Sequence, residues 1–64
     1  MNRNDELLTV AQVRALLGGV PLRTFYRWRQ VGEAPVAVRL PNRELRFWRS
    51  EVLAWLDAHR EDAA

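Results

Sequence analysis

Cysteine and lysine are both absent from this sequence, and histidine occurs only once. Without cysteine, the chain can form no disulfide, no thiolate metal site and no cysteine nucleophile, which fits a reducing compartment. No apolar run approaches the ~20 residues of a membrane span, and residues 1–6 lack the apolar stretch of a signal peptide. We therefore expect a soluble protein of the cytoplasm with no membrane partner.

The chain is also short. Sixty-four residues allow one small domain, which buries only about 60% of the surface that its unfolded chain exposes. Three Trp, two Phe and one Tyr supply enough apolar area for such a domain to fold without a disulfide or metal. We predict a single domain over residues 1–64, with an ordered part of about 7–59, frayed ends and no room for an effector domain.

The charges are unevenly distributed along the chain. All ten basic residues are Arg, and eight of them lie from Arg14 to Arg49. This segment contains only Glu33 and Glu44 as acids, so its net charge is +6, and the total of +2 leaves −4 for the two flanks. Genomic GC bias is the alternative explanation of Arg in place of Lys, but such a bias would not account for the clustering. Arg is suited to planar, bidentate contacts with phosphate and guanine.

Two short helices are expected first. Thr9-Val10-Ala11-Gln12 matches a capping box, and Gly18-Gly19 offers the positive φ that ends a helix, which places a helix at about 10–17. Pro21 suits a first helical position, so a second helix is predicted over 22–31, closed by Gly32.

The second helix has two different faces. At 100° per residue, Phe25 and Trp28 point to one side, which we assign to the core. The opposite side carries only long polar or basic side chains, namely Arg23, Tyr26, Arg27 and Gln30.

A β-hairpin and a third helix complete the pattern. Residues 36–40 alternate like a half-buried strand, 41–44 form a turn with Pro at its second position, and 45–48 return as the partner strand. Trp48 points away from the core face, and either covers the back of the hairpin or contacts a protein. Ser50 is expected to cap a third helix, whose inner face carries Val52, Trp55, Leu56 and His59.

This order of elements predicts a mainly α fold with a small β-hairpin: a winged helix-turn-helix with a two-stranded wing and a C-terminal helix. In that fold the second helix enters the DNA major groove. We predict that Arg23, Arg27 and Gln30 read bases, and that DNA backbone or wing contacts come from Tyr26, Arg29, Arg39, Arg43 and Arg46. The alternatives are a solvated charged helix face and a hairpin edge protected by charge.

No catalytic group can be assembled from the remaining polar residues. Glu44, Glu51 and Asp57 have no partner His, paired carboxylate or glycine-rich loop, and His59 is assigned to packing or to the surface. We therefore expect no enzyme activity, no metal ion, no cofactor and no small-molecule substrate.

Three segments carry a family resemblance: Leu7–Val13 with Leu16-Leu17-Gly18, Arg23–Trp28, and Arg46–Val52 with Ala54-Trp55-Leu56. Together they resemble the excisionase-type, MerR-related winged-helix family of phages and mobile elements, over roughly residues 7–57. The resemblance implies base reading by Arg23, Arg27 and Gln30 and backbone or minor-groove contacts around residues 43–46. The turn is one residue longer than in that family, and Pro21 stands in place of a Ser-like cap.

The first functional hypothesis is an excisionase, or recombination directionality factor. Such a protein binds and bends attachment-site DNA on bacterial or phage DNA in the host cell, beside neighbouring copies of itself, and promotes excision by an integrase. The second hypothesis is a small MerR-like transcriptional regulator that uses the same face on promoter DNA. The third is a protein-interaction adaptor whose Arg face meets an acidic partner.

Overall fold

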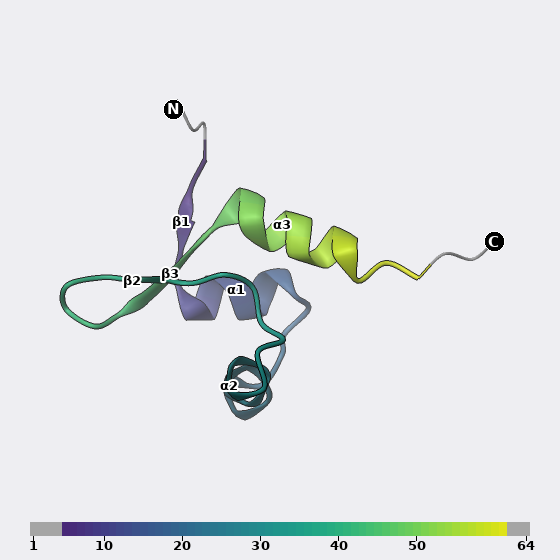
Figure 1. Cartoon of the computed structure of the whole chain (residues 1–64), viewed down its shortest axis with the longest axis horizontal. Helices are drawn as coiled ribbons and strands as arrows, with labels where there is room; N and C mark the ends of the chain where they lie inside the picture. The colour runs from purple at the N-terminus through teal and green to yellow at the C-terminus, as the bar shows by residue number, and fades with distance from the viewer. Residues whose placement is uncertain (1–4, 62–64) are drawn as a thin grey trace.

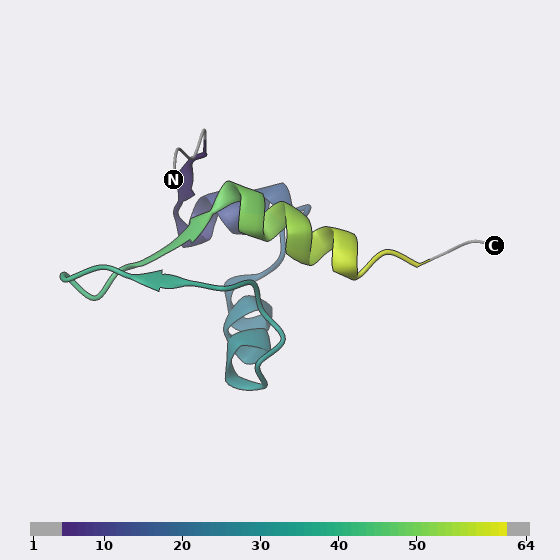
Figure 2. The same ribbon diagram turned by 45° about the horizontal axis from the view of Figure 1, so that its top comes forward.

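Three helices and a small antiparallel sheet make up the computed structural model, which describes residues 5–61 (Figure 1). The elements, in chain order, are β1 (Leu7–Leu8), α1 (Val10–Leu16), α2 (Leu22–Gln30), β2 (Val38–Arg39), β3 (Leu45–Trp48) and α3 (Arg49–Ala58). The loop between β2 and β3 projects from the helical body as a wing (Figure 2). The predicted winged helix-turn-helix is confirmed, with one additional strand, β1.

Helix α1 begins at the predicted capping box. The Thr9 hydroxyl accepts a hydrogen bond of 3.1 Å from the Gln12 amide, and the Gln12 side chain accepts one of 2.8 Å from the Thr9 amide. The helix ends at Leu16, one residue before the predicted end. The following turn is fastened by Arg14, whose Nε donates to the Val20 carbonyl at 2.8 Å. Among the eight Arg between residues 14 and 49, Arg14 therefore has a structural role in the turn.

Helix α2 starts at Leu22, as predicted, but Pro21 is its N-cap and not its first helical residue. Pro21 has φ −61° and ψ 148°, which is extended, while its carbonyl accepts the first helical hydrogen bond from the Phe25 amide at 3.0 Å. The fixed φ of proline suits both the N-cap and the first helical position, so only the ψ angle distinguishes the two. At the other end Gly32, with φ 75°, follows the C-cap Val31.

The core lies where the sheet meets the helices. Its buried members come from every part of the chain: Leu8, Val13, Phe25, Leu45, Phe47 and Val52. Phe25 of α2 and Phe47 of β3 pack edge to face, with ring centroids 5.6 Å apart. Full burial of such a side chain contributes roughly 1.5–3 kcal/mol. The predicted inward faces of the second helix and of the second wing strand are confirmed.

The sheet has the order β1-β3-β2, and both pairings are antiparallel. Val38 pairs with Arg46 and Arg39 with Leu45, whereas β1 pairs with the other half of β3. The predicted strand over 36–40 is thus too long. The ladder begins only at Val38, and the segment that leads to it from α2 instead packs inward, with Pro35 buried and Ala37 against the core.

Helix α3 is capped from a distance. Ser50 was expected to be its N-cap, but the N-cap is Trp48, whose side chain does not cap the helix, and Ser50 lies inside the helix. The carboxylate of Asp5 accepts hydrogen bonds from the Ser50 amide, at 3.0 Å, and from the Ser50 hydroxyl. The Arg49 amide donates to the Glu6 carbonyl at 2.8 Å. Pairing of β1 with β3 brings residues 5 and 6 to this position.

Candidate nucleic-acid interface

The outer face of α2 carries the side chains that the helical periodicity placed there. Arg23, Tyr26, Arg27 and Gln30 are all exposed, and together they line a shallow hollow of about 480 Å³. No acidic side chain lines this hollow. The predicted base-reading residues therefore share one solvent-facing surface, with the spacing of four and three that a helix needs to present them to one groove.

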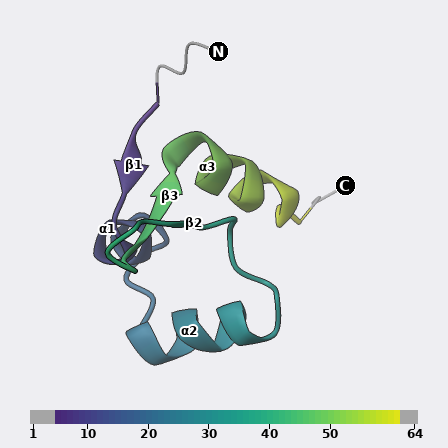
Figure 3. The same ribbon diagram turned by 60° about the vertical axis from the view of Figure 1, so that its left-hand side comes forward.

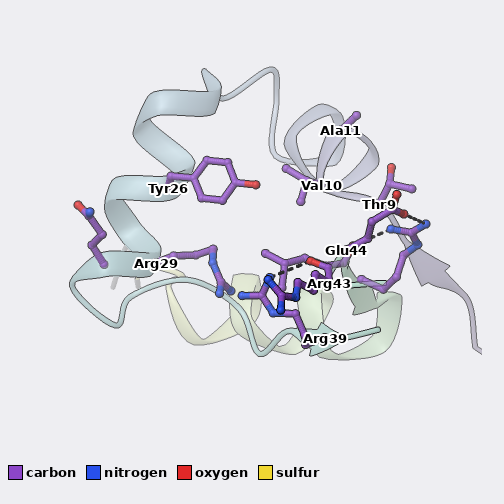
Figure 4. A pocket seen from close by; sticks show the side chains of 11 residues that line it. Thr9, Val10, Ala11, Tyr26, Arg29, Arg39, Arg43 and Glu44 are labelled. Carbon is purple, nitrogen blue, oxygen red and sulfur yellow. Dashed lines mark hydrogen bonds and ion pairs between the residues drawn. The ribbon is translucent and has the colours of Figure 1, made fainter. Parts of the chain in front are cut away.

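A larger groove of about 930 Å³ lies between α1, α2 and the wing (Figure 4). Its lining comes from three elements: Thr9, Val10 and Ala11 at the start of α1, Tyr26, Arg29 and Gln30 from α2, and Arg39, Arg43, Glu44, Leu45 and Arg46 from the wing. Tyr26 and Gln30 line both the hollow and the groove. We call the joined surface the basic face, because it contains six Arg and one acid.

The side chains of α2 reach across the groove. Figure 4 shows Tyr26 pointing toward Val10 of α1, and Arg29 extending toward Arg39 and Arg43 of the wing. Tyr26 is 43% exposed and its ring packs edge to face on the buried Phe25, with centroids 6.1 Å apart. The phenol is thus held by the core on one side and open to a ligand on the other.

The wing tip has a defined conformation. The Arg43 amide donates to the Leu40 carbonyl at 2.8 Å, which closes the turn with Pro41 in its predicted second position. Arg43 itself has φ 72°, in the left-handed region that costs a non-glycine residue roughly 1–2 kcal/mol. Nη1 of Arg39 donates to the Arg43 carbonyl at 2.8 Å, and the Asn42 side chain accepts from the Glu44 amide at 3.0 Å.

The structure also separates the arginines by what they touch. Arg46 is 26% exposed; its guanidinium pairs with Glu44 at 2.8 Å and donates to the Leu45 carbonyl. Arg23 and Arg27 have no ion pair within residues 5–61. Sequence reasoning did not identify the Glu44–Arg46 pair, because Glu44 lies in the turn just before β3 and its direction depends on the conformation of that turn.

The structure of residues 5–61 also bears on metal-ligating clusters, membrane-spanning helices and the single histidine. Among residues 5–61, no group of three or more His, Cys, Asp or Glu side chains is arranged to hold a metal ion. Within the same range, no helix has both the length and the apolar character needed to cross a membrane. His59 is the C-cap of α3 and is exposed, and its ring is tilted by 45° against that of Trp55.

Comparison with known proteins adds the family. The family model that describes a helix-turn-helix domain matches residues 7–60, which is most of the chain. Neither the curated proteins nor the solved structures give a match to this chain. The matched range spans α1, α2 and the wing, and it ends just beyond α3. The chain therefore belongs to the helix-turn-helix domain family of DNA-binding proteins.

Proposed function

We propose that the basic face is the DNA-binding surface, with α2 in the major groove and the wing on the adjacent backbone or minor groove. The observation that carries this proposal is the continuity of the face from the outer side of α2 to the wing tip through Tyr26 and Gln30. Six Arg with one acid create a positive potential along that surface, which attracts a phosphate backbone.

Within this surface the residues have different roles. Arg23 and Arg27 present guanidinium forks that match guanine O6 and N7, and Gln30 presents an amide that matches adenine N6 and N7. Tyr26 and Arg29 border the groove toward the wing, where they contact the backbone, and Arg39, Arg43 and Arg46 supply the wing's charge. Contacts to the DNA backbone fix the register of the protein on DNA but do not read its sequence.

We further propose that the protein is an excisionase-type architectural factor, which binds and bends attachment-site DNA and thereby promotes excision by an integrase. The resemblance of three segments to that family supports this role. One module of this size covers about 600–1,000 Å² of protein surface on DNA, which favours cooperative binding of neighbouring copies over tight binding of one. Such a factor acts by bending DNA and not by catalysing a reaction, and so it needs no catalytic group or cofactor.

Footprinting on the attachment DNA of the element that carries the gene, with and without its integrase, tests this role. We expect several direct repeats to be protected in tandem and excision to increase when the protein is present. A single protected site at a promoter, with no effect on recombination, would instead assign the protein as a small MerR-like regulator. No affinity for DNA even at low salt would overturn both roles.

A further inference from the structure

A third hollow, of about 290 Å³, lies apart from the basic face. It is lined by Trp28, Glu33, Trp55, Leu56 and His59, and none of these residues lines the basic face. We call it the aromatic hollow. It forms where α2 and α3 end, and Figure 3 shows the C-terminal ends of both helices on the same side of the molecule.

Aromatic rings form the walls of this hollow and are fixed in place. The rings of Trp28 and Trp55 are tilted by 40° with centroids 6.0 Å apart, and Trp55 and His59 lie with centroids 4.4 Å apart. Nε1 of Trp55 donates to the Glu33 carbonyl at 3.1 Å, which ties α3 to the segment after α2. The walls therefore exist before any ligand arrives.

The electrostatics of the aromatic hollow favour a cation. Glu33 is its one charged lining residue, it is exposed, and no ion pair within residues 5–61 involves its carboxylate. The carbonyl ends of α2 and α3 add partial negative charge. Nδ1 of His59 lies 2.8 Å from the Trp55 carbonyl, which can only accept, so Nδ1 donates in this contact and the ring is held against α3.

We propose that the aromatic hollow binds an arginine side chain presented by a protein partner. A guanidinium stacks on indole rings through its planar face and donates in its plane, here to the Glu33 carboxylate. A lysine ammonium is more strongly hydrated and has no plane to stack. The hollow shares no lining residue with the basic face, so the two surfaces can bind different partners at the same time.

Titration with a capped Gly-Arg-Gly tripeptide, followed by the indole N–H resonances of ¹⁵N-labelled protein, tests the proposal. Variant Trp48→Phe identifies the Trp48 indole signal, and the two remaining signals belong to Trp28 and Trp55. We expect the signals of Trp28 and Trp55 to shift and saturate with the arginine peptide, and to shift much less with the matched citrulline and lysine peptides. Equal shifts with citrulline or lysine would overturn the assignment of a guanidinium, as would an arginine titration that moves neither indole.

A pair of charge variants locates the binding. Glu33→Gln should weaken the arginine peptide by about two- to fivefold, the range of an exposed ion pair. Glu6→Gln removes the same charge beside the other end of α3, where the Glu6 carbonyl accepts from the Arg49 amide, and should leave the affinity unchanged. Equal effects of the two variants would mean that only net charge matters and would contradict the site. Both variants should bind DNA as the unmodified protein does, because neither residue lies on the basic face. A failure of the arginine site would therefore leave the proposed DNA binding intact, and a failure of DNA binding would leave the arginine site intact.

Discussion

Arg39 braces Arg43: its Nη1 donates a hydrogen bond of 2.8 Å to the carbonyl of Arg43, across the turn of the wing. Arg43 lies at the tip with φ 72°, and this bond helps to offset the cost of that conformation. The two arginines, assigned to the same role from sequence, therefore differ. One orders the tip, and the other presents its charge from the tip.

Replacement of Arg43 tests the contribution of the tip charge. Arg43→Asn removes the charge but tolerates a left-handed φ, so the turn should persist. We expect binding to all DNA sequences to weaken alike, and the slope of log affinity against log salt to fall in magnitude by about one unit. Affinities measured over a salt series provide the slope. An unaltered slope would place the wing off the DNA.

Arg27 is expected to behave differently, because it lies on the outer face of α2. Arg27→Ala should lower specific affinity by about 1–3 kcal/mol and relax the preference at one base pair. Binding-site selection with both proteins measures the preference. Arg60→Ala is the matched control, since Arg60 pairs with Asp57 at 3.3 Å and lies outside the basic face. Identical selected sites for Arg27→Ala and the unmodified protein would remove Arg27 from base reading.

Glu44 is the only acid on the basic face, and it holds the guanidinium of Arg46 at 2.8 Å. Glu44→Gln should release Arg46 toward phosphate and remove a repulsive charge. We expect tighter binding to unrelated DNA, with a salt slope steeper by about one unit. The measurement is a salt series on non-specific duplex. Weaker binding to that duplex would show that Glu44 positions Arg46 for DNA and does not restrain it.

Asp5 should contribute to folding through the start of α3. Asp5→Ala removes the carboxylate that accepts from the amide and hydroxyl of Ser50, and loss of a cap costs about 0.5–2 kcal/mol in free energy of unfolding. Urea unfolding measures the change. Glu6→Ala is the control, because only its backbone carbonyl contacts α3. If both variants unfold at the same urea concentration as the unmodified protein, the Asp5 contacts add nothing measurable.

The sequence allowed prediction of features set by neighbours in the chain. The Thr9–Gln12 capping box and the two faces of α2 depend on residues three or four apart, and the structure confirms both. The Asp5–Ser50 contacts join residues 45 apart, and they depend on β1 pairing, which two residues are too few to predict. The braced tip depends on the φ of Arg43, and a left-handed Arg has no sequence signal.

The most direct test of the central claim is an NMR titration of the ¹⁵N-labelled protein with a duplex obtained by binding-site selection. We expect the largest shifts, and the contacts to DNA protons, to map to the outer face of α2 and to the wing tip, at Arg23, Arg27 and Arg43. The indole signal of Trp55, on the aromatic hollow, should change little. Contacts concentrated on α3, with the arginines of α2 unaffected, would contradict the account.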